Sequence, residues 1–251
     1  MGSTDKSQEE FIVLVTGFGP FKNDFPRNPS WDIASTLPSY LPILNAKSST
    51  SVRDASIALP PVRILVHPEP IRVTYATVRE LVPKLWNPEF SGVPRIDFVL
   101  HIGMASTQPK YSLEQLGHRD DYKIRDLDGA VPVQDQDSPD WPWLNVPSQL
   151  TTGLDVGDVH QRWTKHLPHN EIPLLVSTNA GHFLCDYIYF NSLAQCFKAN
   201  ETRRVAFLHV PAAKAAPEDH YEEHIKVGRE VATQLIRSIV ESELSRSGLT
   251  A

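Results

Sequence analysis

One of the two cysteines in the chain lies where a strand-like pattern gives way to a helical one. In the stretch VSTNAGHFLCDYIYFNSL (176–193), an apolar run ends in the loop NAG, and a helix is predicted to begin near His182 or Phe183. Cys185 then falls in the first helical turn, where free backbone N–H groups and the helix dipole stabilise a thiolate. The same N–H groups can hold an oxyanion during acyl transfer. Cys185 is therefore a candidate nucleophile, and the alternative is a buried thiol with a structural role.

A cysteine nucleophile requires a base, and the chain contains ten histidines. His209 is the best placed, because RVAFLHVP puts it at the carboxyl end of the predicted strand that follows the one before Cys185. Consecutive strands of α/β folds are often neighbours, so we expect these two strand ends to bring the sulfur and the imidazole together. Two alternatives remain: His182 is the base, or His209 is a hydrogen-bonded histidine that closes its strand.

The opening stretch VTGFGPFKNDFPRNPSW (15–31) joins a strand end to a helix start. It has neither the G-x-G-x-x-G spacing of a dinucleotide-binding loop nor the Lys-Ser/Thr of a P-loop. Phe18 and Phe21 lie close to the loop, where a role in the core is not assured. We expect them to line an apolar pocket, with the amide of Asn28 as a polar contact.

Apolar runs of strand length alternate along the chain with amphipathic, helix-like segments. The predicted strands cover 11–16, 62–67, 96–103, 172–178 and 204–210. The predicted helices lie near 31–37, 75–86, 154–167, 183–198 and 217–246. This alternation predicts an α/β fold: a single-domain α/β/α sandwich with a mostly parallel twisted sheet flanked by helices.

The predicted domain spans residues 11–246, with flexible ends at 1–10 and 247–251. Two segments rich in Ser, Asp and Pro, 46–60 and 126–151, are predicted to be long surface loops. The last predicted helix carries a clean apolar stripe at helical spacing. The stripe consists of Val231, Ala232, Leu235, Ile236, Ile239 and Val240.

Composition excludes several classes of protein and partner. The net charge is −6 and no long basic run occurs, so nucleic acid is not an expected partner. No apolar run approaches the roughly 18 residues that span a bilayer, so a membrane is not expected either. Cys185 and Cys196 lie about 16 Å apart if they share one helix, which is too far for a disulfide. Two free thiols and a polar start without the apolar run of a signal peptide favour the cytoplasm.

Short motifs in a fixed order carry a resemblance to one family. VTGFGPF…NPSW, HIGMA…SLEQ, STNAGHFLCDYIYFNSL and FLHVP resemble motifs of the type I pyroglutamyl peptidases, and the likeness spans residues 11 to about 240. These cysteine peptidases remove an N-terminal pyroglutamate from peptides and have one α/β/α domain. The resemblance implies that Cys185 is the nucleophile and His209 the general base and acid. It also implies that Glu114, in SLEQ, is the carboxylate that orients the imidazolium; otherwise Glu114 is an ordinary solvated charge.

The resemblance also implies the substrate: peptides with an N-terminal pyroglutamate. Phe18, Phe21 and Asn28 fall on the family's lactam-binding positions. A flat, neutral lactam calls for aromatic walls and a few hydrogen bonds. Neither a metal nor a cofactor is expected, and a homo-oligomer is compatible with the sequence.

The chain departs from the family pattern at several places. KND replaces the small glycines usual after GFGPF, and Met104 follows Gly103 where bacterial members carry a polar residue. Apparent inserts lie near 46–60 and 136–147. These departures bear on substrate preference and assembly more than on the nucleophile.

Two competing hypotheses remain. HYEEH (220–224) matches the H-x-x-E-H pattern of inverted zinc peptidases, in which His220 and His224 would bind zinc and Glu223 would activate water. The alternative for His220 and His224 is that they pack along the apolar stripe of the same helix or lie on an exposed helix turn. The second hypothesis is a non-catalytic peptide-binding module on the same fold, against which the retained Glu, Cys and His argue.

Overall fold

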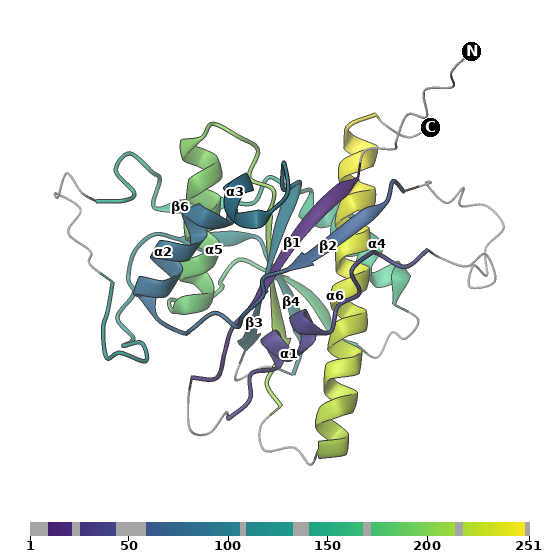
Figure 1. Cartoon of the computed structure of the whole chain (residues 1–251), viewed down its shortest axis with the longest axis horizontal. Coiled ribbons are helices and arrows are strands. Elements are labelled where there is room, and N and C mark those ends of the chain that lie inside the picture. Colours follow the sequence, from purple (N-terminus) through teal and green to yellow (C-terminus); the bar gives the residue numbers. More distant parts are fainter. Residues whose placement is uncertain are drawn as a thin grey trace.

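A six-stranded sheet forms the centre of the computed structural model (Figure 1), which describes residues 10–21, 26–43, 59–105, 109–132, 141–167, 172–213 and 218–248. The strands of this sheet, in chain order, are β1 (Phe11–Gly17), β2 (Val62–Val66), β3 (Phe98–Ala105), β4 (Tyr111–Glu114), β7 (Leu174–Ser177) and β8 (Val205–Pro211). A separate two-stranded ribbon pairs β5 (Leu116–His118) with β6 (Gln149–Thr151).

The strand order of the main sheet is β2-β1-β3-β8-β4-β7. The first four of these strands are parallel, whereas β4 is antiparallel to β8 and parallel to β7. The mostly parallel sheet of the predicted α/β fold is confirmed. The expectation that the strand before Cys185 lies beside the strand of His209 is wrong, because β4 separates β7 from β8 and β7 runs in the opposite direction. The four residues of β4, YSLE, form no apolar run that periodicity could identify.

Six helices surround the sheet in the described part of the chain. They are α1 (Pro29–Ser35), α2 (Tyr75–Leu85), α3 (Pro88–Ser91), α4 (Val156–His166), α5 (Leu184–Lys198) and α6 (Glu218–Arg246). Local chemistry fixes several of their starts. Asn28, Thr74 and Asp155 each accept a hydrogen bond from a first-turn backbone N–H of the helix that follows.

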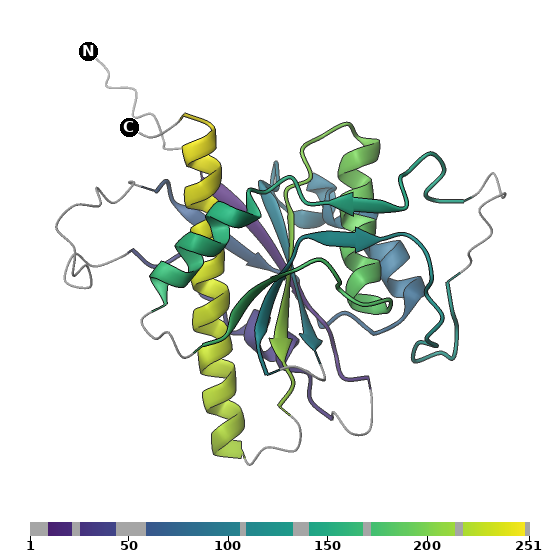
Figure 2. The same ribbon diagram turned by 180° about the vertical axis from the view of Figure 1, so that it is seen from behind.

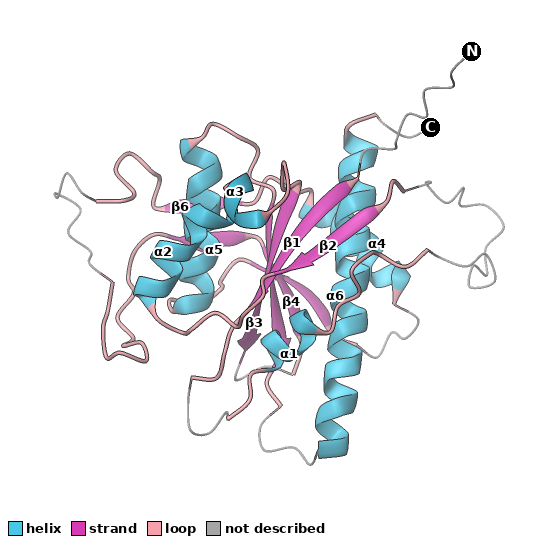
Figure 3. Cartoon of the chain, in the orientation of Figure 1, coloured by secondary structure: helices cyan, strands magenta, loops and turns pink. Residues whose placement is uncertain are grey.

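The helices form two layers, with α1, α4 and α6 on one face of the sheet and α2 and α5 on the other (Figures 1 and 3). Each layer buries its own apolar core against the strands. The stripe from Val231 to Val240 on α6 is fully buried, which accounts for the stability of this long helix. None of the helices formed by the described residues is both long and apolar enough to cross a membrane.

Alternation along the strands decides which layer each side chain meets. In β8, Ala206, Leu208 and Val210 pack in the core beneath α6, whereas Val205 and Phe207 pack in the core beneath α5. His209 shares the parity of Phe207 and therefore points toward α5. The same reasoning places Glu114 on that face of β4, because its neighbour Leu113 belongs to the α6 side.

The predicted surface loop at 126–151 is only partly a surface loop. Trp141, Trp143 and Val146 are buried, and Trp143 makes edge-on contacts with Tyr187 and Phe190 of α5. The segment ends in β6, whose ribbon with β5 lies beside α5 (Figure 2). Proline and aspartate content predicted an exposed loop, but the tryptophans between them gain more by covering the helix. Residues 1–9, 44–58, 133–140 and 249–251 lie outside the described residues. They include most of the apparent insert at 46–60, the first five residues of the apparent insert at 136–147 and most of the predicted flexible ends.

Candidate active site

Three side chains from three separate elements meet beneath the start of α5. Cys185 lies in the first turn of this helix and hydrogen-bonds His209 of β8. His209 Nδ1 lies 2.8 Å from Glu114 Oε1 on β4, although the two residues are 95 positions apart in the chain. A thiol, an imidazole and a carboxylate in series form the arrangement required for nucleophilic catalysis.

The antiparallel insertion of β4 brings the carboxylate to the imidazole. In the β4–β8 register, Ser112 faces His209 and Glu114 faces Phe207. Glu114 and His209 therefore stand diagonally on the same face of adjacent strands, within reach of a long side chain. The hydroxyl of Tyr189 on α5 donates to the backbone carbonyl of Glu114 at 2.8 Å and ties the strand to the helix.

A glycine provides the space into which the sulfur fits. Gly103 on β3 is the register partner of His209. A Cβ atom on Gly103 would lie 2.9 Å from the Cys185 sulfur and 2.5 Å from Cζ of Phe207, both too close for real contacts. The absence of a side chain at Gly103 therefore lets the sulfur approach the sheet.

The partners of His209 govern its charge. Burial by itself lowers the pKa of this imidazole, but the neighbouring Cys185 sulfur and the Glu114 carboxylate outweigh burial and raise the pKa to about 10. Glu114 is only 2% exposed, so it is not the solvated charge that was the alternative. The imidazole is thus held as an imidazolium at neutral pH, in hydrogen-bond contact with the Cys185 sulfur.

The two free thiols of the chain lie in contrasting surroundings. Cys196 is 3% exposed near the end of α5, and burial raises its pKa to about 12. Cys185 is partly exposed and lies beside a positively charged imidazole. The structural role that was the alternative for Cys185 fits Cys196 instead.

The first turn of α5 offers backbone donors next to the sulfur. The helix begins after Phe183, whose side chain supplies no capping hydrogen bond. Within the described part of the chain, the N–H groups of Cys185 and Asp186 are therefore left without a side-chain cap at the helix start. Such donors are suited to an oxyanion that forms when the sulfur attacks a carbonyl group.

The three predicted pocket residues occupy different environments. Phe18 is buried in the core with Tyr75, whereas Phe21 is partly exposed and its ring lies 5.7 Å from that of Phe183, just before the nucleophile. Asn28 is 5% exposed, and both ends of its amide are used within the protein: Nδ2 donates to the carbonyl of Gly19 and Oδ1 accepts from Ser30. Asn28 thus shapes the loop and caps α1.

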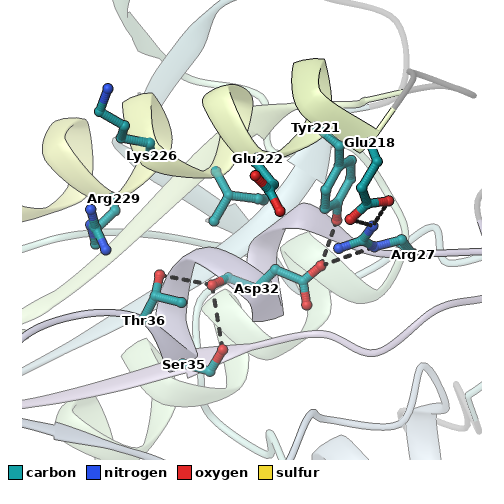
Figure 4. Close-up of a pocket in the computed structure, with 10 residues that line it drawn as sticks. Arg27, Asp32, Ser35, Thr36, Glu218, Tyr221, Glu222, Lys226 and Arg229 are labelled. Carbon is teal, nitrogen blue, oxygen red and sulfur yellow. Dashed lines mark hydrogen bonds and ion pairs between the residues drawn. The ribbon is translucent and has the colours of Figure 1, made fainter.

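An ion network anchors this loop to α6. Arg27 donates to Glu218 at 2.8 Å and stacks 3.7 Å above the ring of Tyr221, whose hydroxyl donates to Asp32 of α1 at 2.6 Å (Figure 4). These residues line a shallow hollow between α1 and the start of α6. Because Arg27 immediately precedes Asn28, the network fixes one end of the predicted pocket loop.

The competing candidates lie elsewhere. His182 is exposed, and its Nδ1 lies 3.3 Å from the carbonyl of Asp120. In the predicted zinc motif, His224 Nε2 lies 3.0 Å from the carbonyl of Pro211, and Glu223 pairs with Lys226. Within the described residues, the group of convergent metal-ligand atoms does not include this motif.

Sequence reasoning missed several supporting residues. His101 on β3 is fully buried, with Nδ1 2.7 Å from the hydroxyl of Thr16 and Nε2 2.7 Å from the hydroxyl of Ser192. It joins β1, β3 and α5 directly beneath the site. A histidine inside an apolar strand run was the available signal, since a buried histidine requires partners for both nitrogens.

Comparison with known proteins gives consistent results. The family model described as pyroglutamyl peptidase matches residues 90–237. The chain is 29% identical over 204 residues to pyroglutamyl-peptidase 1 of Homo sapiens, covering 81% of this chain and 80% of the relative. It is 25% identical over 203 residues to the pyrrolidone-carboxylate peptidase of Bacillus subtilis (strain 168), covering 79% and 77%. A solved structure of a mutant pyrrolidone carboxyl peptidase from Pyrococcus furiosus has the same fold, with a TM-score of 0.62 at 20% identity over 92% of this chain and 99% of that chain.

Proposed function

The chain belongs to the pyroglutamyl peptidase family, and from this premise we propose that it hydrolyses the peptide bond after an N-terminal pyroglutamate by cysteine catalysis. The observation that carries the mechanism is the series formed by the partly exposed Cys185 and the buried His209 and Glu114. Nucleophile, acid–base group and orienting carboxylate are in contact before any substrate binds.

The proposed reaction has two halves. The Cys185 thiolate attacks the carbonyl carbon of the pyroglutamyl residue, and the resulting oxyanion accepts hydrogen bonds from the first-turn N–H groups of α5. As the carbon–nitrogen bond breaks, the His209 imidazolium gives its proton to the leaving amine, and a thioester remains. Water then attacks the thioester while His209 takes up its proton, and loss of the sulfur restores the thiolate–imidazolium pair.

Glu114 acts on the histidine rather than on the substrate in this scheme. It fixes the Nδ1 side of the ring at 2.8 Å and stabilises the positive charge that the pair requires. Because the carboxylate is buried, its field is weakly screened by water. We therefore assign Glu114 a positioning role.

The aromatic side chains near the sulfur supply walls for a neutral lactam. Phe183 lies 5.7 Å from Phe21 and 6.0 Å from Tyr75, measured between ring centroids. A pyroglutamyl ring carries no charge, so apolar flat surfaces suit it better than an acidic subsite for an ammonium group. We place the lactam ring beside Phe21, with Phe18 and Asn28 shaping the loop behind it. The free thiols favour a reducing compartment such as the cytoplasm.

Hydrolysis of pyroglutamyl-p-nitroanilide tests the proposal. We expect Cys185→Ser to lower kcat by at least about 10³-fold, because a serine hydroxyl is not ionised by an imidazolium. Cys196→Ser is the matched control, since this thiol lies outside the site, and it should keep the parent rate. Iodoacetamide should abolish activity in the parent and in Cys196→Ser. A Cys185→Ser protein that hydrolyses the substrate as fast as the parent would rule out the thiol mechanism. A parent protein that binds pyroglutamyl peptides without hydrolysing them would instead support the non-catalytic peptide-binding module.

A further inference from the structure

A second cluster of reactive side chains lies at the start of α5. It consists of His118 on β5, His182 in the loop before α5 and Asp186 in the first turn of α5. One ligand atom from each lies within 4.8 Å of the others. We propose that these three residues bind a divalent transition-metal ion, with Zn²⁺ as the occupant that suits two imidazoles and a carboxylate.

Asp186 is held in place as a metal-binding carboxylate needs to be. Its side chain is fully buried, and Oδ1 accepts a hydrogen bond from the backbone N–H of His118 at 3.1 Å. Oδ2 accepts one from the hydroxyl of Tyr122 at 3.0 Å. Oδ1 also lies 3.4 Å from His118 Nδ1, so these contacts orient the carboxylate toward the imidazole of His118.

The two imidazoles face this carboxylate from different segments. Their ring centroids are 4.8 Å apart, and His118 Nδ1 lies 3.3 Å from Asp186 Oδ2. His182 turns its Nδ1 toward the carbonyl of Asp120, at 3.3 Å. When one imidazole nitrogen donates to a carbonyl in this way, the other carries the lone pair that binds a metal.

The spacing requires only a small adjustment. Zinc at about 2.1 Å from each of its tetrahedral ligands places the ligand atoms about 3.4 Å from one another. The widest separation in the cluster, at most 4.8 Å, must therefore shorten by up to about 1.4 Å. His182 is exposed on a loop, where its ring can rotate inward.

The charge at this place also favours a cation. Asp186 is a fully buried carboxylate, and its ion-pair partner among the described residues is His118 rather than a lysine or an arginine. Without a compensating positive charge, burial raises the pKa of Asp186 to about 7. A divalent ion would displace that proton, compensate the carboxylate charge and link β5 to the first turn of α5.

The site is separate from the nucleophile. The Cys185 sulfur lies against Gly103 and His209, and Cys185 is not a member of the convergent group. A bound ion would therefore leave the thiol free, although it would fix the turn that carries it.

The test uses Zn²⁺ and the full chain with Cys185→Ser, which removes the thiolate as a competing ligand. Isothermal titration with ZnCl₂ should show one ion per chain. His118→Gln and His182→Gln should each lower the affinity at least about tenfold. His182 is exposed, so its variant tests the site without disturbing the core. His220→Gln, in the unused H-x-x-E-H motif, is the matched control and should bind as the parent does.

Thermal unfolding gives a second readout. Zinc should raise the melting temperature of the Cys185→Ser parent and of His220→Gln, but not that of His182→Gln. Equal binding by His118→Gln, His182→Gln and the parent would overturn the proposal, as would a loss of binding confined to His220→Gln. No measurable binding by the parent would overturn it as well. Because all variants lack the thiol, none of these outcomes depends on peptidase activity.

Discussion

Two buried histidines stand two register positions apart on the same face of adjacent strands, yet they differ fundamentally. His101 on β3 lies between the hydroxyls of Thr16 and Ser192, and burial lowers its pKa to about 3. His209 on β8 is also buried, but the Cys185 sulfur and the Glu114 carboxylate raise its pKa to about 10. Both rings are buried, so the groups that contact each ring decide whether it is charged.

The difference assigns separate tasks to the two rings. Between two neutral hydroxyls, His101 remains a neutral connector of β1, β3 and α5. Between a thiol and a carboxylate, His209 holds a proton that it can transfer. A buried histidine in a sheet is therefore a candidate for catalysis only when ionisable groups contact it.

Replacing each histidine in turn tests whether His209 is catalytic and His101 structural. His209→Gln should lower kcat on pyroglutamyl-p-nitroanilide by about 10³-fold, because the amide cannot exchange a proton with the leaving amine. His101→Gln should change kcat by less than about fivefold but lower the free energy of unfolding by about 1–3 kcal/mol, because Thr16 and Ser192 lose a buried partner. Steady-state kinetics and urea unfolding of both variants measure the two effects. Similar losses of kcat in both variants would contradict the division of tasks.

Replacing Glu114 tests whether this carboxylate keeps His209 charged. Glu114→Gln should lower kcat by about 10²-fold with a smaller change in KM, because the amide no longer stabilises the imidazolium. The pKa of His209 should fall, and alkylation of Cys185 by iodoacetamide should become slower at pH 6 to 7. The rate of alkylation against pH, with Cys196→Ser as the background, measures this change. An unchanged turnover number would remove Glu114 from the mechanism.

The smallest expected effect concerns stability in acid. The pKa of His101 is about 3 in the folded protein, below the usual 6.5. Between these values the unfolded chain binds the proton and the folded protein does not, so stability falls as the pH falls through this window. His101→Gln should therefore show a shallower decline in unfolding free energy between pH 6.5 and 4.5 than the parent does. Equal declines in the unfolding free energy of the two proteins would show that another group governs the loss of stability in acid.

Much of the fold could be predicted from local pattern. The apolar runs of β1, β2, β3 and β8 and the stripe of α6 identified these elements, because each buries a continuous or periodic set of apolar residues. The resemblance in four motifs indicated the family, which the matching family model confirms. The short strands β4, β5 and β6 gave no such signal, because none of them forms an apolar run.

The position of the nucleophile could be inferred from the residues around Cys185. A cysteine in the first turn of a helix after an apolar strand already has backbone donors and a favourable dipole, because these are local properties. The two-residue period of a strand likewise puts His209 on the same face of β8 as Phe207.

The groups that contact Cys185, in contrast, depend on how distant strands pair. Glu114 is one of 30 acidic residues, and nothing in its neighbours distinguishes it before β4 pairs antiparallel with β8. β7, the strand that leads to Cys185, is not adjacent to β8, which carries His209. The space for the sulfur depends on Gly103 of β3. The physical reason is that hydrophobic periodicity records which face of a segment is buried, whereas pairing between distant strands decides what that face contacts.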